Sequence, residues 1–311
     1  MKTAVVTGAS GFIGGALTTY LLEKGVTVCG VDIQTPRLDS FCKYPNFVPV
    51  IASFQEYDSL GKMIREKLPQ AEEIDVFYHF AWQGVYGAAF QDYALQLNNA
   101  RFAAQAIDQA IEAGAKKFVF AGTMNEYEMD AYIGADYFEP RYTYIYSVAK
   151  QASEAICKTI AFNKGISFCA GRIAMAYGEN NRSMMVPNVV MKNLINHVPC
   201  KLVKGDNLYD MVYIDDIVRA FEAIGEKGTP MKSYYIGHRT QRSFREIIRD
   251  IADILNPDCP LLFGEYPDVP SGVDYKNIDV DSLYRDTGFE CSADFRQSIL
   301  NTAAWLKESG L

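Results

Sequence analysis

Residues 7–15 read TGASGFIGG, and they continue the apolar run TAVVT at residues 3–7. Gly8, Gly11 and Gly14 are spaced three apart, between a predicted strand and a predicted helix. The first glycine permits a tight turn, the second lets backbone N–H groups approach a pyrophosphate, and the third lets the helix pack close to the strand. The helix N-terminus then directs its partial positive charge at the phosphates. The stretch predicts a dinucleotide-binding βαβ unit.

Asp32 follows the second predicted strand, in VDI at residues 31–33. A carboxylate in this place can accept hydrogen bonds from both hydroxyls of the adenosine ribose, and it would repel a 2′-phosphate. The sequence therefore favours NAD over NADP as cofactor.

Short β-branched runs alternate with amphipathic segments through the first half of the chain. Apolar residues on both faces of the strands predict an α/β fold, a doubly wound parallel sheet with helices on both sides. The helical segments include residues 57–68 and 95–113. The predicted strands are TAVVT (3–7), VTVCGV (26–31), NFVPVI (46–51), DVFYHF (75–80), KKFVFAG (116–122) and SFCAGRI (167–173).

The composition changes near residue 172, where Gly, Pro and Asn begin to cluster and helices such as 244–255 and 295–307 dominate. We expect a cofactor-binding domain over residues 1–171, which residues 208–236 rejoin as a further strand and helix. A smaller, mostly helical substrate domain is expected over 172–207 and 237–311.

Composition excludes several classes of function. The 311-residue chain is 49% hydrophobic, which suits a globular protein, and it has no apolar run of about 18 residues that would span a membrane. With no leader sequence recognised, we expect a cytoplasmic protein. A net charge of -8 disfavours nucleic acid as a partner. Seven scattered Cys and three isolated His predict reduced thiols and no metal site.

Two Tyr-x-x-x-Lys pairs occur, Tyr20 with Lys24 and, in YSVAK, Tyr146 with Lys150. The first pair lies on the helix that leads away from the glycine turn, so we expect no catalytic role for it. The second pair follows the fifth strand, whose carboxyl end carries Thr123, and open α/β sheets bind ligands at that edge. Position therefore selects Tyr146 and Lys150 as candidate catalytic residues.

The spacing of the second pair suits proton transfer. Residues four apart share one helix face, so the Lys150 ammonium could lie beside the Tyr146 phenol. A charge about 4 Å away could lower the pKa of the phenol by about three units, to near 7. Tyr146 could then act as general base and acid, and Thr123 could bind the same substrate oxygen.

These motifs together resemble the extended short-chain dehydrogenase/reductase family, in its nucleotide-sugar epimerase/dehydratase branch. The resemblance covers nearly the whole chain and implies that Thr123, Tyr146 and Lys150 are catalytic. It rests on TGASGFIGG, VDI, YHFAW, LNNA, AGTMNEY, YSVAK, GRIAMAYG and VYIDD, in this order. The NAD contacts that it implies are Gly8, Gly11, Phe12, Ile13, Gly14, Asp32, Ile33, Phe80, Ala81, Asn98 and Lys150.

The resemblance also implies a homodimer. The helix over 94–113 and the helix that carries Tyr146 would pack against their copies as a four-helix bundle.

The sequence departs from the family pattern after the catalytic Thr, where dehydratases of the family carry Asp-Glu and this chain has Met124 and Asn125. Methionine transfers no proton, so dehydration is disfavoured, and Glu126 is one residue out of register.

Three substrate positions also differ from the family, and here the chain carries Met175, Tyr209 and Ser271. Arg182, or Lys192 on the following helix, could bind a diphosphate instead, or either could be a solvated surface charge. Tyr209 could stack on a nucleotide base, although core packing is an alternative.

These features lead to a principal hypothesis and two alternatives. The principal one is an NAD-dependent nucleotide-sugar epimerase that oxidises the sugar C4 hydroxyl transiently to a 4-keto intermediate. An NAD(P)H-dependent 4-ketoreductase of a nucleotide-linked deoxysugar is the first alternative, and a non-catalytic NAD-binding regulator is the second. The identity of the sugar and of the nucleotide stays open.

Overall fold

Seven parallel strands form the central sheet of the computed structural model, which describes residues 1–69, 73–133, 135–137, 139–268 and 273–310. The strand order is β11-β6-β5-β4-β1-β2-β3, which confirms the predicted doubly wound parallel sheet. The strands are β1 (Thr3–Thr7), β2 (Thr27–Asp32), β3 (Phe47–Ile51), β4 (Ile74–His79), β5 (Ala115–Thr123), β6 (Ser167–Ile173) and β11 (Lys232–Ile236).

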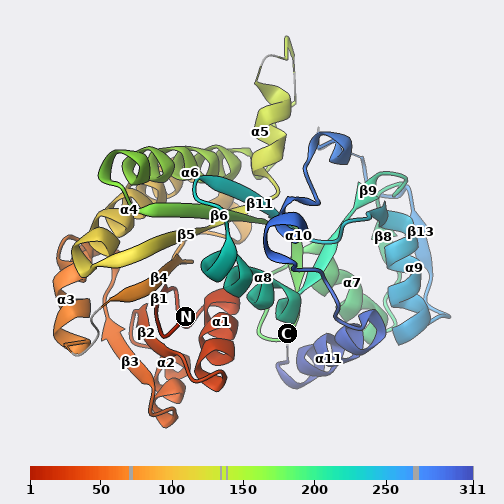
Figure 1. The fold of residues 1–311 in the computed structure, drawn as a ribbon. Helices are drawn as coiled ribbons and strands as arrows, with labels where there is room; N and C mark the ends of the chain where they lie inside the picture. The colour runs from red at the N-terminus through yellow and green to blue at the C-terminus, as the bar shows by residue number, and fades with distance from the viewer. Residues whose placement is uncertain (70–72, 134, 138, 269–272, 311) are drawn as a thin grey trace.

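Helices cover both faces of this sheet (Figure 1). The helices are α1 (Phe12–Glu23) and α8 (Ile214–Lys227) on one face, and α3 (Leu60–Lys67), α4 (Tyr93–Ala113) and α6 (Tyr144–Lys164) on the other. Successive side chains of a strand point to opposite faces. In β1, Val6 accordingly packs into the core that contains α1 and α8, and Val5 packs into the core beneath α3, α4 and α6. This two-sided burial is the reason why the strands are apolar throughout.

The strand register brings the ends of three strands to one level of the sheet edge. Thr7 of β1 lies opposite Val31 of β2 and opposite His79 of β4. The chain therefore leaves β1 in one direction to β2 and β3, and returns on the other side to β4, which makes the end of β1 the switch point of the sheet. Ligands of such folds bind in the crevice at this point.

A second group of elements packs beside the sheet, at the blue end of the chain in Figure 1. Its small sheets pair β7 with β10, β8 with β13 and β9 with β12. The strands are β7 (Met175–Tyr177), β8 (Cys200–Leu202), β9 (Leu208–Tyr209), β10 (Met211–Tyr213), β12 (Arg242–Ser243) and β13 (Leu261–Phe263). The helices of this group are α7 (Val186–Ile195), α9 (Phe244–Leu255) and α11 (Phe295–Glu308). Three shorter helices lie beside the central sheet: α2 (Pro36–Ser40) after β2, α5 (Glu126–Tyr132) after β5, and α10 (Ser282–Thr287), which packs on α8 and β11.

Residues 208–236 divide between the two groups. β10 pairs with β7, outside the central sheet, whereas β11 extends the central sheet beside β6. The division of the chain into a cofactor domain and a substrate domain stays a prediction. No helix within the described residues is both long enough and apolar enough to traverse a lipid bilayer.

Candidate active site

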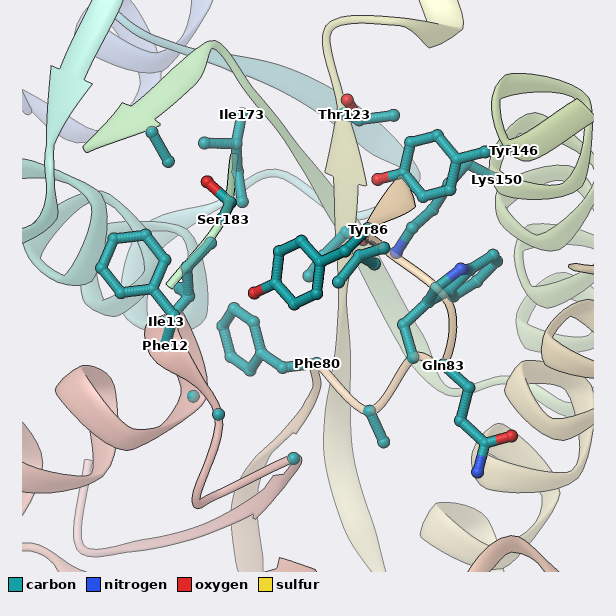
Figure 2. Close-up of a pocket in the computed structure, with 18 of the residues that line it drawn as sticks. Phe12, Ile13, Phe80, Gln83, Tyr86, Thr123, Tyr146, Lys150, Ile173 and Ser183 are labelled. Atoms are coloured by element: carbon teal, nitrogen blue, oxygen red, sulfur yellow. Dashed lines mark hydrogen bonds between the residues drawn. The ribbon is translucent and has the colours of Figure 1, made fainter. Parts of the chain in front are cut away.

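A cavity of about 550 Å³ opens at the carboxyl ends of β1, β2, β4, β5 and β6 (Figure 2). Most of the residues predicted from the sequence line it. They are Gly8, Gly11, Phe12, Ile13, Gly14, Asp32, Ile33, Phe80, Ala81, Thr123, Tyr146 and Lys150. Both predicted motifs reach the cavity, because the glycine turn and the second Tyr-x-x-x-Lys pair follow strands whose carboxyl ends lie at the same edge of the sheet.

The glycine turn is shaped to hold a phosphate group. Gly8 has φ +69°, a backbone conformation that favours glycine, and its carbonyl accepts the N–H of Gly11 at 2.9 Å. A Cβ atom on Gly14 would lie 2.2 Å from the Gly8 carbonyl oxygen, so only glycine permits this approach. No side chain among the described residues caps α1, which begins after Gly11. The N–H groups of its first turn are therefore available to an anion, as a dinucleotide requires.

Asp32 is held against the same turn. Its Oδ2 atom accepts hydrogen bonds from the backbone N–H and the hydroxyl of Ser10, both at 2.8 Å, and Oδ1 accepts the N–H of Ile33 at 2.8 Å. A carboxylate has about four acceptor positions, so Oδ1 keeps one for a ribose hydroxyl. The residues at this end of the cavity fit the adenosine and pyrophosphate of NAD.

The loop after β4 forms the floor of the cavity, and two buried amide side chains of α4 hold it. Asn99 accepts the N–H of Gln83 at 3.0 Å and donates to its carbonyl at 2.8 Å. Gln96 donates to the carbonyls of Gly84 and Ala89 and accepts the indole N–H of Trp82 at 2.9 Å. These contacts satisfy the loop's backbone and fix the position of the Trp82 ring.

The structure does not place Asn98, predicted as a cofactor contact, at the cavity. Asn98 is exposed and absent from the lining, whereas Asn99 is 2% exposed and clamps the loop. Adjacent helical residues point about 100° apart, so a shift of one position separates the solvent side of α4 from the loop side.

Replacing Asn99 by Ala is expected to lower the free energy of unfolding by about 1–3 kcal/mol, because two backbone groups of Gln83 lose their partners. NAD affinity should fall with it, since the loop lines the cavity. Asn98→Ala is the control and should change stability by no more than about 0.5 kcal/mol. Chemical denaturation of both variants measures this difference, and equal losses would contradict the assignment.

The three predicted catalytic residues lie together at the end of the cavity opposite the glycine turn (Figure 2). Thr123 ends β5, and Tyr146 and Lys150 occupy successive turns of α6. The Tyr146 ring makes edge-to-face contacts with Trp82 and Phe90, at centroid distances of 6.0 and 5.2 Å. Aromatic packing on two sides fixes the phenol, so its hydroxyl points into the cavity.

Lys150 is buried, at 5% exposure, with its ammonium held by the strand and by aromatic rings. The Nζ atom donates to the carbonyl of Ala121 at 2.8 Å and lies 3.8 Å from the centroid of the Trp82 ring. Burial disfavours the charged form and lowers the pKa of Lys150 to about 7, although the carboxyl group of Glu126 opposes this change. The charge of Lys150 therefore changes near neutral pH.

The expected lowering of the phenol's pKa by Lys150 is not seen. Burial raises the pKa of Tyr146 above its ordinary value, the charge of Glu126 raises it further, and only the Thr123 hydroxyl acts in the opposite direction. The Lys150 ammonium bonds the Ala121 carbonyl and lies 6.0 Å from the Tyr146 ring centroid. The ammonium is thus engaged by the carbonyl group at the end of β5.

The other Tyr-x-x-x-Lys pair lies away from the cavity, on α1. The Tyr20 hydroxyl donates to Glu222 of α8 at 2.7 Å, and Lys24 forms an ion pair with the same carboxylate at 2.5 Å. This pair links the two helices that cover one face of the sheet.

The substrate end of the cavity is rich in methionine and has no carboxylate in the described lining. Met124, Met175 and Met185 line it, and among the described lining residues only Asp32 and Lys150 carry a formal charge. Arg182 is exposed, and its charge acts on Arg37 near the glycine turn.

The remaining substrate positions do not contribute to the lining. Tyr209 is packed edge-on against Phe244, at a centroid distance of 5.2 Å, and lies outside the lining, as does Arg182. The position of Tyr209 agrees with core packing. Ser271 lies outside the described residues.

Several lining residues escaped prediction, among them Trp82, Gln83, Tyr86, Asn125, Thr143, Asn181 and Ser183. Trp82 is the last residue of the YHFAW stretch and Gln83 follows it, so the sequence indicated this loop but not how far it extends along the cavity. Asn181 and Ser183 belong to a loop after β7 that no short-range pattern connects to the cavity.

Comparison with known proteins identifies the family to which this chain belongs. The family model "NAD dependent epimerase/dehydratase family" matches residues 4–237. The dTDP-D-glucose 4,6-dehydratase of Mus musculus is 24% identical over 264 residues, which cover 82% of this chain and 73% of that protein. A trifunctional UDP-glucose 4,6-dehydratase, epimerase and reductase of Arabidopsis thaliana is 23% identical over 273 residues. That match covers 83% of this chain but only 40% of the plant protein's length.

A solved structure shares the fold over the whole length. The UDP-glucuronic acid 4-epimerase of Bacillus cereus, in complex with UDP-glucuronic acid and NAD, superposes with a TM-score of 0.77. The sequences are 22% identical, and the alignment covers 99% of this chain and 100% of that one. At this identity the likeness concerns the fold.

Proposed function

Because this chain belongs to the NAD-dependent epimerase/dehydratase family, we propose that it is a nucleotide-sugar epimerase that transiently oxidises the C4 hydroxyl of its substrate. One observation carries the proposal. Thr123, Tyr146 and Lys150 converge at one end of a cavity whose other end is a phosphate-binding glycine turn.

The chain's own residues supply proton transfer and orientation. Tyr146 takes the proton of the sugar hydroxyl and returns it after the 4-keto intermediate has turned over, and Thr123 holds the same oxygen. Lys150 lies one helical turn after Tyr146, and its ammonium is held at the same end of the cavity by the Ala121 carbonyl and the Trp82 ring. NAD, when bound at the glycine turn, supplies the reversible redox chemistry.

The lining supports epimerisation over dehydration. Loss of water needs an acid and a base beside the sugar, and Met124 and Asn125 follow Thr123 in the places expected for them. Glu126 is 0% exposed and absent from the lining, so its carboxyl group does not reach the cavity. The described lining of the substrate end therefore offers no carboxyl group that could act as this acid or base.

The charges also indicate the kind of sugar. A uronic acid brings a carboxylate into the cavity, where the one cationic side chain of the described lining, Lys150, is already engaged by the Ala121 carbonyl and the Trp82 ring. Three methionines offer contact area but no hydrogen-bond donor. We propose that the sugar is a neutral hexose, and that the nucleotide part of the substrate lies outside the cavity.

Turnover of a substrate panel tests the proposal. The NAD-loaded protein is incubated with UDP-glucose, UDP-galactose, UDP-glucuronic acid and dTDP-glucose, and sugars are separated by chromatography and identified by mass spectrometry. We expect the protein to form the C4 epimer of a neutral sugar, at a rate at least about tenfold higher than for UDP-glucuronic acid. The absorbance of reduced nicotinamide should show no net change. Stoichiometric consumption of reduced cofactor with a 4-keto-6-deoxy sugar would instead support the ketoreductase. Cofactor binding without turnover of any substrate would support the regulator.

Exposed apolar side chains on α4 and α6 support the proposed homodimer. Tyr93 and Leu97 of α4 are 68% and 58% exposed, and Ile156 and Phe162 of α6 are 42% and 75% exposed. Pairing of these helices with their copies would bury this surface. A cytoplasmic location remains a prediction from sequence.

A further inference from the structure

A buried carboxyl group lies directly behind the catalytic strand end. Glu126, the first residue of α5, is 0% exposed, and its Oε1 atom accepts the backbone N–H of Thr123 at 2.7 Å. Its Oε2 atom lies 3.3 Å from Nε of Arg172, on the neighbouring strand β6. One carboxyl group thus links the end of β5, the start of α5 and the adjacent strand.

Arg172 extends this contact to a second buried carboxyl group. Its Nε and Nη2 atoms donate to Glu154 of α6 at 3.0 and 3.1 Å, and the Ser233 hydroxyl of β11 donates to the same carboxylate at 2.5 Å. Asp130 of α5, which is exposed, lies 3.6 Å from Nη1. Two buried carboxyl groups therefore share a single guanidinium.

The residue before Thr123 is adapted to Glu126. A Cβ atom on Gly122 would lie 2.6 Å from Oε1 of Glu126 and 3.2 Å from Cγ of Arg172. A side chain at residue 122 would displace the Glu126 carboxyl group from the Thr123 N–H. Glycine at position 122 and glutamate at position 126 are therefore mutually dependent.

We propose that Glu126 is a positioning residue of the catalytic centre, which fixes the backbone of Thr123 at the end of β5. The inference rests on the proposed function, in which Thr123 takes part in the reaction. Glu126 itself does not line the cavity and touches no substrate atom.

The electrostatics of the cluster agree with this role. Burial and the Glu154 carboxylate raise the pKa of Glu126 well above its ordinary value, with Arg172 acting in the opposite direction. Burial acts to raise the pKa of Glu154 too, but hydrogen bonds from Glu126 and Arg172 outweigh it and lower the value.

Glu128→Val is the matched control for changes at position 126, because Glu128 is also buried, lies on α5 and pairs with Arg141 without touching Thr123. In the Glu128→Val variant, the further change Gly122→Ala should lower the melting temperature as much as it does in the wild type.

A mutant cycle and a kinetic comparison test the positioning role. Gly122→Ala should lower the melting temperature of the wild type more than that of Glu126→Val, which removes the atom 2.6 Å from the added Cβ. Equal effects overturn the contact.

With a substrate identified by the panel above, Glu126→Val should lower kcat at least about tenfold with KM for NAD little changed, and Glu126→Gln, which keeps an acceptor for Thr123, should recover most of it. Unchanged kcat in Glu126→Val would overturn the positioning role. If Tyr146→Phe keeps full turnover while Gly122→Ala still destabilises the wild type more than Glu126→Val, the proposed function fails and the contact between Gly122 and Glu126 stands.

Discussion

Tyr146→Phe is expected to lower kcat by about 10²–10⁴-fold while NAD still binds, because the substitution removes one hydroxyl group and leaves the ring. The ring packs against Trp82 and Phe90, so the fold around it should persist. Steady-state kinetics with the epimerised sugar and calorimetry with NAD separate the two effects. Turnover within about tenfold of the wild type would remove Tyr146 from the mechanism.

The chain contains its own control for this substitution. Tyr20 has the same spacing to a lysine, but its hydroxyl bonds Glu222 between α1 and α8, away from the cavity. Tyr20→Phe should leave kcat and KM unchanged and should cost about 1 kcal/mol of stability for the lost hydrogen bond. A fall in kcat comparable with that of Tyr146→Phe would mean that both variants act through the fold and not through the reaction.

Gly14→Ala is expected to abolish NAD binding at millimolar cofactor and to destabilise the protein by about 1–3 kcal/mol. The added Cβ would lie 2.2 Å from the Gly8 carbonyl oxygen and 2.9 Å from its carbon, both backbone atoms. The turn must therefore shift away from α1, and the N–H groups of the first helical turn lose their common direction. Calorimetric titration with NAD and thermal unfolding of the apo protein measure the two consequences.

Gly15→Ala, one residue further along the same helix, is the matched control. Its added Cβ would meet only the guanidinium end of Arg37, at 2.7 Å, and that flexible side chain can move. Alanine is also preferred over glycine within helices by about 1 kcal/mol. NAD affinity should therefore persist in Gly15→Ala. Loss of binding in both variants would show that α1, and not the approach of Gly14 to Gly8, is the sensitive feature.

The rotation of α4 about its own axis explains why Asn99, and not the predicted Asn98, contacts the loop at the cavity. The LNNA stretch indicated that an asparagine of α4 serves the site, but it did not distinguish Asn98 from Asn99. Only Asn99 faces the loop after β4 and bonds its backbone. A helix places adjacent residues about 100° apart, so the choice depends on how α4 is rotated against the sheet.

The pKa of Tyr146 shows a second limit. Helical spacing brings Lys150 and Tyr146 to the same face, and from this the sequence predicted a phenol with a lowered pKa. The pKa is instead raised, because burial disfavours the phenolate and Glu126 adds to this effect, while the Lys150 ammonium bonds the Ala121 carbonyl. These influences come from residues far away in the sequence, and spacing along one helix contains no information about them.

The sequence by itself determined the parallel sheet and the glycine turn, because each rests on a short-range pattern: apolar strands that alternate with amphipathic segments, and three glycines in a turn. It predicted Tyr146 and Lys150 from two residues four apart on a helix, and Thr123 from its place at the end of a strand. Only the tertiary structure decided that Glu126 lies behind Thr123, that Asn99 holds the loop, and that Arg182 and Tyr209 lie outside the lining. These outcomes depend on burial and on contacts between segments distant in the chain. Such contacts are set by the packing of α5, β6 and α6 against one another.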